Sequence, residues 1–418
     1  MIESQDIHFL ENARRAEAAM RPLFPPTPLQ RNAYLSEKYG ADIWLKREDL
    51  SPVRSYKIRG AFNAISKRVS DGQTRFACAS AGNHAQGVAY ACQHFKVHGV
   101  IFMPVTTPQQ KIEKTRVFGG DTIDIQLVGD YFDDTLAAAQ AYCAEAGAYF
   151  LSPFDDSDVI EGQSTVAVEL LDQMPKPPDM VILPVGGGGL SAGVLQVMQT
   201  VSPQTELRFV EPKGGASLSA ALQSGAPVAL PKVDNFVDGA AVAKVGAKTF
   251  AALGQVPPDH VLIAPEDRIC NTMLEMLNVE GVVLEPAGAL SVDVLQPLSK
   301  EIPGKKVVCV TSGGNFDFER LPEVKERALR FAGLKKYFIL RLPQRPGALK
   351  DFLGFLGPTD DIARFEYLKK SARNFGSVLI GIETTEAESF QRLFARLEEA
   401  GFPYRDITED ALLAEFLI

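Results

Sequence analysis

The chain of 418 residues carries a formal net charge of −9, with 46% hydrophobic and 23% charged residues. At roughly 150 residues per domain, this length predicts two or three domains. The acidic balance and the lack of a dense Lys/Arg block argue against a nucleic-acid partner, and no apolar run approaches the roughly 20 residues of a membrane span.

The N-terminus and the cysteines indicate the compartment. Residues 1–6 carry early acids and no apolar core, so they predict neither a secretory signal nor a transit peptide. Five cysteines are scattered without Cys-x-x-Cys spacing, which favours reduced thiols over a disulfide framework or a zinc site. We therefore expect a cytoplasmic protein without a membrane partner.

From Ile43 to about Asn315, short apolar or β-branched runs alternate with helical stretches. The predicted strand–helix pairs are 75–78 with 83–95, 97–104 with 109–118, 121–128 with 131–147, 180–185 with 190–201, and 206–210 with 216–224. A last strand is expected at 306–310, before a Gly-Gly turn. This alternation predicts stacked βαβ units on parallel strands, and hence an α/β fold.

The pattern changes after a charged helix at 322–331, which is the best candidate linker. The predicted order there is strand, helix, two adjacent strands, helix and a last strand, at 335–342, 348–356, 362–369, 377–383, 388–400 and 404–407. This order predicts a small ferredoxin-like α+β module. We place the domain limits at 1–330 and 335–418.

Lys57 lies at the start of a predicted helix, within the run Ser55-Tyr56-Lys57-Ile58-Arg59-Gly60. The small and apolar residues that follow, from Gly60 to Ala64, would desolvate an ammonium and lower its pKa toward that of a usable nucleophile. The competing interpretation is a solvated surface lysine.

The turn Ser80-Ala81-Gly82-Asn83-His84 lies between a predicted strand and a helix. Backbone N–H groups at such a helix N-terminus can receive a carboxylate, and the side chains of Ser80 and Asn83 add donors. The alternative is an ordinary N-cap turn. We expect His84, inside the first helical turn, to be a hydrogen-bonded structural group and not a general base.

Four glycines, Gly186 to Gly189, follow the apolar strand and open a helix, where bare backbone donors and the helix dipole can hold a phosphate. A second interpretation stays open, because Gly187, Gly189 and Ala192 also satisfy the relaxed dinucleotide fingerprint. Glu211 would then be the ribose-binding acid about 20 residues later. A nicotinamide enzyme leaves Lys57 and Asn83 unexplained, however.

The run Thr311-Ser312-Gly313-Gly314-Asn315 closes the last strand of the large domain, where ligands of parallel sheets bind. The alternative is a strand-end turn. A nucleophilic amine, a donor-rich turn and a glycine cradle are together the parts needed to hold pyridoxal phosphate and present it to an amino acid.

Taken in order, these runs and Glu285-Pro286-Ala287-Gly288-Ala289 resemble the fold type II pyridoxal phosphate enzymes, most closely the biosynthetic threonine dehydratases. The resemblance spans about residues 20 to 418, and its tail resembles the ACT-like regulatory domain of the shorter form. It implies large and small catalytic subdomains on parallel sheets, the small one at about 55–160, followed by a C-terminal ferredoxin-like regulatory domain.

The resemblance also implies roles for individual residues. Lys57 is the Schiff-base lysine beside Tyr56, Asn83 contacts the cofactor 3-oxygen, and Ser312 meets the pyridine nitrogen. The phosphate would be held by Gly186, Gly187, Gly188, Gly189 and Leu190, and the substrate carboxylate by Ser80, Ala81, Gly82, Asn83 and His84. Related racemases have a serine at the position of Ala81, so its absence argues against racemisation. Regulatory candidates are Arg345, Gly347 and Asp361.

The implied activity is deamination of L-threonine to 2-oxobutanoate and ammonia, the first step toward isoleucine, with isoleucine as effector and a homotetramer or homodimer as the assembly. Glu211 and the carbonyl of Gly215 have the spacing of a cation site seen in relatives, but Ser217 replaces the acid expected there, so we assign no metal ligand. A catabolic serine/threonine dehydratase, a nicotinamide dehydrogenase and a non-catalytic amino-acid sensor remain as alternatives.

Overall fold

A computed structural model describes residues 4–368 and 374–410, in two compact units. The first comprises Met1–Glu266 and Met276–Phe316, and the second Asp267–Glu275 and Asp317–Ile418. Among the described residues, no helix combines the length and apolar character that crossing a bilayer requires. Lys369, the last residue of one predicted strand, lies outside the described residues, as do residues 1–3.

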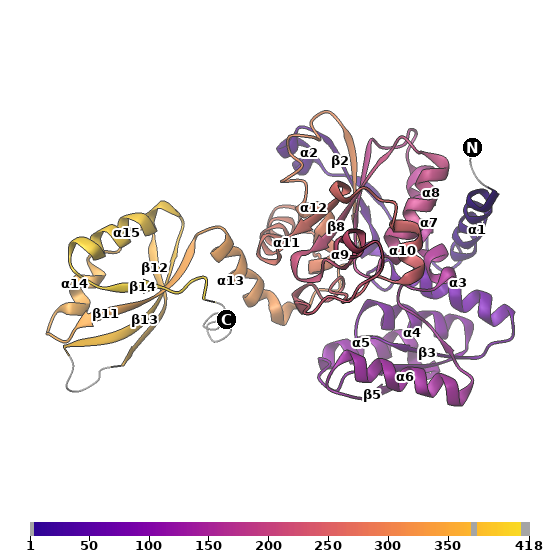
Figure 1. Ribbon diagram of the computed structural model, residues 1–418, viewed down its shortest axis with the longest axis horizontal. Helices are drawn as coiled ribbons and strands as arrows, with labels where there is room; N and C mark the ends of the chain where they lie inside the picture. The colour runs from indigo at the N-terminus through magenta and orange to yellow at the C-terminus, as the bar shows by residue number, and fades with distance from the viewer. Residues whose placement is uncertain (1–3, 369–373, 411–418) are drawn as a thin grey trace. The chain divides into compact units, whose positions relative to one another are not determined.

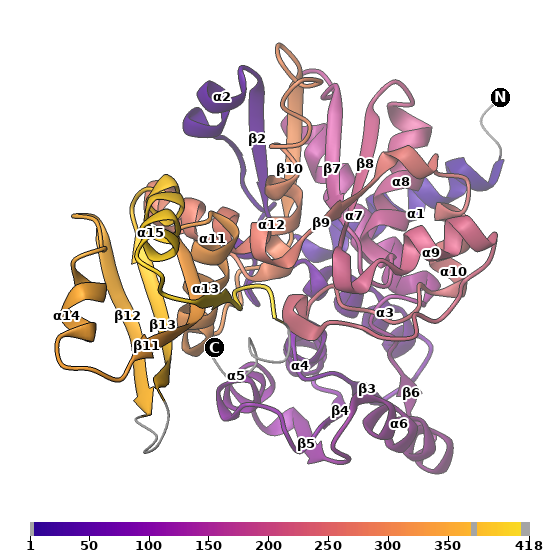
Figure 2. The same cartoon turned by 60° about the vertical axis from the view of Figure 1, so that its left-hand side comes forward.

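The first unit contains a six-stranded sheet in the order β1-β2-β10-β7-β8-β9. Two of its strands, β2 and β8, are labelled in Figure 1, and β2, β10, β7 and β8 follow one another in Figure 2. Its strands are β1 (Leu29–Arg31), β2 (Asp42–Arg47), β7 (Met180–Pro184), β8 (Glu206–Pro212), β9 (Val261–Ala264) and β10 (Lys306–Thr311). All neighbours are parallel except β1 and β2. β7 is buried along its whole length, as its unbroken apolar sequence requires in the middle of a parallel sheet.

A second, four-stranded sheet in the same unit has the order β5-β4-β3-β6 and is parallel throughout (Figure 2). Its strands are β3 (Arg75–Ala79), β4 (His98–Met103), β5 (Ile123–Leu127) and β6 (Tyr149–Phe150). The helices between them are α4 (Asn83–Phe95), α5 (Gln109–Gly119) and α6 (Phe132–Ala146). The predicted βαβ alternation and the α/β class are confirmed.

The remaining helices of the first unit complete both layers. They are α1 (Ser4–Met20), α2 (Ala33–Tyr39), α3 (Lys57–Ser70), α7 (Ser157–Gln173), α8 (Gly189–Val201), α9 (Ser217–Ser224), α10 (Ala247–Leu253) and α12 (Pro286–Asp293). The helix α11 (Glu266–Glu280) is shared between the two units.

α3 begins at Lys57 and packs against α4 and α7. Glycine permits both close approaches. A Cβ at Gly162 of α7 would collide with the carbonyl oxygen of Arg59, and one at Gly87 of α4 would fall 3.1 Å from the backbone of Lys57. The first turns of α3 are therefore held at fixed positions between two neighbouring helices.

The second unit is the predicted ferredoxin-like module. Its elements are α13 (Leu321–Phe331), β11 (Lys335–Pro343), α14 (Ala348–Leu353), β12 (Asp360–Leu368), β13 (Phe375–Thr384), α15 (Glu388–Glu399) and β14 (Tyr404–Asp406). The antiparallel sheet has the order β12-β13-β11-β14 over a core that includes Phe338, Phe352 and Leu397. α13, predicted as a linker, belongs to this unit, where Arg330 donates a hydrogen bond to the carbonyl of Thr408 (2.7 Å). The domain limits at 330 and 335 stay predictions.

A fully buried ionic cluster lies under the start of α3. Arg59 donates from Nε to Glu48 Oε2 (2.7 Å) and from Nη1 to Glu169 Oε1 (2.7 Å). Lys46 Nζ donates to Glu169 Oε2 (2.6 Å). Burial alone would raise the pKa of Glu169, but the two cations and their hydrogen bonds outweigh it and lower that pKa to about 2.

The substitution Glu169→Ala tests this cluster, because it leaves two buried cations without their shared anion. We expect a loss of about 3–5 kcal/mol in the free energy of unfolding, measured by chemical denaturation. Asp172→Ala is the matched control on the same helix, since Asp172 is 60% exposed and makes only a 4.0 Å ion pair with Arg14. That change is expected to cost less than about 1 kcal/mol. Equal losses for the two variants would contradict the assignment.

Candidate active site

The ammonium of Lys57 lies within the first unit, beside the carbonyl of Pro153. Its Nζ donates a hydrogen bond to the carbonyl of Pro153 (2.9 Å) and lies 5.3 Å from the centroid of the Tyr56 ring. Burial lowers the pKa of Lys57 to about 8, although the nearby Glu285 carboxyl opposes that shift. At pH 7 about a tenth of Lys57 is therefore a neutral, nucleophilic amine, a much larger fraction than for a solvated lysine.

The end of β10 lies directly beside this lysine. The N–H of Tyr56 donates to the carbonyl of Ser312 (3.1 Å), and the N–H of Gly314 donates to the carbonyl of Arg54 (2.9 Å). The Ser312 hydroxyl is buried and donates to the carbonyl of Ala287 (3.3 Å). Residues 256 and 260 apart in sequence are thus joined by backbone hydrogen bonds, which places Ser312 at the same site as Lys57.

The turn before α4 presents its backbone as predicted. Ser80 Oγ accepts from the N–H of Gly82 (3.2 Å), and Gly82 has open space within 4 Å of the position where a Cβ would stand. The N–H groups that follow, in the first turn of the 13-residue α4, have no intrahelical acceptor. The turn therefore offers both donors and room to a small carboxylate, beside the half-buried Ala81.

His84 has the structural role expected for it. Its Nε2 lies 2.9 Å from the carbonyl oxygen of Leu151, and its ring is buried. Burial, together with the charge of Lys57, lowers the pKa of His84 to about 3, so the ring is neutral. A neutral ring bonded to a carbonyl is unsuited to act as a general base toward a ligand.

The Asn83 carboxamide is held between two side chains, Glu285 and Asn315, that belong to runs predicted at the site but received no role of their own from the sequence. Its Nδ2 donates to Glu285 Oε1 (2.6 Å), and its Oδ1 accepts from Asn315 Nδ2 (2.6 Å). Burial and the charge of Asp238 raise the pKa of Glu285 to about 7. Asn83 and Glu285 are 202 residues apart, and local patterns carry no signal for such a pairing.

The glycine loop before α8 can accept no side chain. A Cβ at Gly187 would overlap the ring of Phe154, one at Gly186 would fall 3.0 Å from Ala240 Cα, and Gly188 has a φ of +91°. The loop and the adjoining first turn of α8, from Gly189 and Leu190, leave backbone N–H groups for an anion. Phe154 directly follows Pro153, the acceptor of Lys57, so consecutive residues contact both the amine and the cradle. These residues fit a phosphate-bearing aldehyde cofactor.

Glu211 has a structural task. Its two carboxylate oxygens accept from the backbone N–H of Leu218 (2.6 Å) and of Ser219 (2.9 Å), at the N-terminus of α9. Burial raises the pKa of this carboxyl and these hydrogen bonds oppose the shift. An acid occupied in this way is a poor ribose acceptor, which weakens the dinucleotide interpretation of the glycine loop.

The three regulatory candidates are divided between the two ends of the second unit's sheet. Arg345 pairs with Asp351 (2.6 Å) just beyond β11, whose last residue, Pro343, is opposite Phe375. Gly347 precedes α14 with a φ of +86°. Asp361, by contrast, is opposite Glu383 at the other end of β13. One copy of the chain does not bring Arg345 and Asp361 together.

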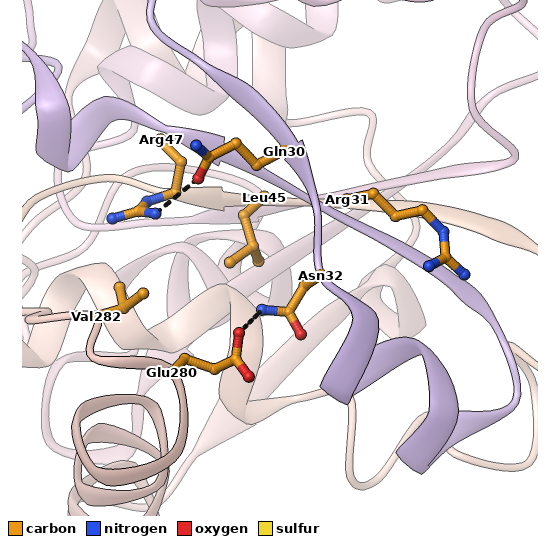
Figure 3. A pocket seen from close by; sticks show the side chains of 7 residues that line it. All are labelled: Gln30, Arg31, Asn32, Leu45, Arg47, Glu280 and Val282. Carbon is orange, nitrogen blue, oxygen red and sulfur yellow. Dashed lines mark hydrogen bonds between the residues drawn. The ribbon is translucent and has the colours of Figure 1, made fainter.

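A cavity of about 450 Å³ lies elsewhere in the first unit, beside β1 and β2 (Figure 3). Its polar side chains bond to protein partners. Asn32 Nδ2 donates to Glu280 (2.7 Å) and Arg47 Nη1 donates to Gln30 (2.9 Å). None of the residues predicted for catalysis lines it, so this cavity is separate from the site around Lys57.

Family models and relatives match nearly the whole chain. A model for pyridoxal-phosphate dependent enzymes matches residues 20–313, and one for the C-terminal regulatory domain of threonine dehydratase matches residues 326–417. The L-threonine dehydratase biosynthetic IlvA of Bacillus subtilis (strain 168) is 46% identical over 421 residues, covering 100% of this chain and 99% of that protein.

Solved structures agree in fold. The processed form of threonine deaminase isoform 2 from Solanum lycopersicum has a TM-score of 0.73 at 35% identity, over 78% of this chain and 89% of that one. The maize serine racemase has a TM-score of 0.69 at 26% identity, over 77% of this chain and 98% of that one. Both support the architecture that surrounds Lys57.

The lowered pKa of Lys57 has a measurable consequence for the apoprotein. Since only the unprotonated amine attacks an aldehyde, the rate of pyridoxal phosphate capture is expected to rise between pH 7 and 9, with a midpoint near 8. Stopped-flow absorbance after mixing apoprotein with pyridoxal phosphate measures this rate. A midpoint at pH 10 or above, as for a solvated lysine, would contradict the buried setting.

Proposed function

The chain belongs to the biosynthetic threonine dehydratases, which are pyridoxal-phosphate-dependent ammonia-lyases, and we propose that it uses Lys57 to convert L-threonine into 2-oxobutanoate and ammonia. The observation that carries this proposal is the joint placement of the amine and the glycine cradle, through Pro153 and Phe154. Membership of the family removes the nicotinamide dehydrogenase and the non-catalytic sensor as alternatives.

Each group in the site has a task in this proposal. Bound pyridoxal phosphate would supply the electron sink that stabilises negative charge at the substrate Cα. Lys57 Nζ would hold the cofactor and, once released, would take the proton from Cα. The donors of Ser80–His84 would orient the substrate carboxylate, Asn83 would bind the cofactor 3-oxygen, and the Ser312 hydroxyl would meet the pyridine nitrogen. Tyr56 would pack beside the cofactor ring.

The matches favour a biosynthetic enzyme over a catabolic serine/threonine dehydratase. The catabolic alternative rests on shared catalytic motifs, whereas the regulatory-domain model covers residues 326–417 of this chain. We propose isoleucine as the effector that this domain binds, a dimer or tetramer as the assembly, and the cytoplasm as the location.

Replacing the nucleophile tests the catalytic assignment directly. Lys57→Ala is expected to abolish the visible absorption band of the bound cofactor and to lower threonine turnover by roughly a thousandfold or more, because the amine that binds the cofactor and takes the Cα proton is then missing. Lys67→Ala is the matched control on α3, since that ammonium pairs with Asp158 (3.0 Å) and Glu161 (2.6 Å), away from the site. A Lys57→Ala protein that keeps the band would overturn the assignment.

Truncation tests the regulatory proposal. Because an effector must bind two global states unequally to change activity, a chain that ends at Ala332 should keep threonine turnover and lose its response to isoleucine. A second chain that ends at Phe316 removes the whole continuous part of the second unit, including α13. Threonine saturation curves with isoleucine titrated in provide the measurement. Truncated enzymes as sensitive to isoleucine as the intact one would refute the proposal.

A further inference from the structure

We propose that Asn315 and Glu285 are positioning residues, which hold the Asn83 carboxamide in one orientation so that it offers a single N–H to the cofactor. We call this pair, with Lys114 behind Asn315, the Asn83 clamp. The proposal rests on the proposed function, because it takes Asn83 as the contact of the cofactor 3-oxygen.

The orientation of Asn315 is set by three partners. Its Nδ2 donates to the carbonyl of Val53 (2.8 Å) and to Asn83 Oδ1 (2.6 Å), and its Oδ1 accepts from Lys114 Nζ. Rotating this amide by 180° would place its oxygen against the carbonyl of Val53 and its NH₂ against an ammonium. Both contacts would be repulsive, so only one orientation satisfies the site.

The orientation of Asn83 follows from that of Asn315. With its Oδ1 turned toward a donor, its Nδ2 must face Glu285, whose Oε1 accepts at 2.6 Å. A carboxamide nitrogen carries two hydrogens, and Glu285 takes one of them. Among the described residues, the second N–H of Asn83 has no protein acceptor, and it is the donor left for the cofactor.

Close packing holds the Glu285 carboxyl in this place. Its backbone N–H donates to the carbonyl of Gly313 (3.2 Å), and a Cβ at Gly313 would collide with Glu285 Oε1. Glu285 is 5% exposed, so a lost partner would not be replaced by bulk water. The clamp thus joins α4, α5, the end of β10 and the start of α12 at one amide.

The Asn83 clamp controls which atom of the Asn83 carboxamide faces the cofactor, whereas the glycine loop before α8 supplies backbone N–H donors. A rotated Asn83 would turn its Oδ1 toward the cofactor oxygen, and two acceptors would then face each other. Loosening either side of the clamp should therefore weaken cofactor binding, even though neither Asn315 nor Glu285 is assigned a contact with the cofactor. This is the behaviour expected of a residue that acts through another one.

The test measures pyridoxal phosphate affinity by titrating the apoprotein, together with the absorption maximum of the bound cofactor. Asn315→Asp keeps the side-chain size but removes both N–H donors, and Glu285→Ala removes the acceptor. Each is expected to weaken affinity about tenfold, which corresponds to about 1.4 kcal/mol. Glu285→Gln keeps an acceptor oxygen for Asn83 and should stay within about threefold of the native protein.

A double-mutant cycle separates positioning from general damage to the fold. In an Asn83→Ala background, Asn315→Asp and Glu285→Ala should cause no further loss of affinity, because the group through which they act is gone. Asn32→Asp is the matched control, since Asn32 is also buried and donates to a carboxylate, Glu280 (2.7 Å), away from the cofactor site. It should leave cofactor affinity unchanged.

Two results would overturn the clamp: native affinity and spectrum in Asn315→Asp, or losses of equal size with and without Asn83. If Glu285→Ala does not fold, the Asn315→Asp cycle decides alone. The proposed function fails separately, when a native protein that binds pyridoxal phosphate does not deaminate threonine, since the cycle measures affinity and not turnover. A native protein that does not bind pyridoxal phosphate would refute both.

Discussion

The position of the nucleophilic lysine depends on a charge buried two residues further along the same helix. Arg59 is one of the largest fully buried side chains, and its guanidinium is shared between Glu48 and Glu169. Removing ions from water costs several kcal/mol each, so this arrangement is favourable only when every donor meets an acceptor in good geometry. A shift or rotation of α3 would break several of these bonds together. The first turn of α3, and with it Lys57, is therefore confined to one position.

Two site residues that ionise with opposite charges, Lys57 and Glu285, have pKa values that lie close together. Burial lowers the pKa of Lys57 to about 8 and raises that of Glu285 to about 7. Both groups therefore titrate within about one pH unit of neutrality, where changes in their surroundings can alter their charge. A phosphate-bearing ligand adds negative charge to the same volume, so binding and protonation are coupled at this site. The rigid backbone donors of the glycine loop carry no such dependence on pH.

Sequence reasoning predicted the local parts of this site and missed the pairs between them. The predicted helix starts, Asn83 and Leu190, match the observed starts, Asn83 and Gly189, to within one residue, because apolar runs, caps and glycines act within a few residues. The bond from Asn83 to Glu285 and the ion pair between Arg59 and Glu169 join residues 202 and 110 apart. Such pairs are set by the order of strands in the sheets and by the packing of helices between them. Hydrophobic periodicity along the chain does not indicate the order of the strands in the sheets.

The second unit illustrates the same limit, with a consequence for regulation. The resemblance suggested Arg345 and Asp361 together as regulatory residues. In the structure, Arg345 follows one end of the sheet and Asp361 lies at the opposite end. Pro343 is opposite Phe375 and Asp361 is opposite Glu383, so the two ends lie eight residue positions apart along β13. At about 3.3 Å per residue this is roughly 26 Å, several times the length of an amino acid. A single effector molecule cannot bridge them within one copy. An effector site that used both residues would need two copies of the chain, and effector binding would then depend on assembly.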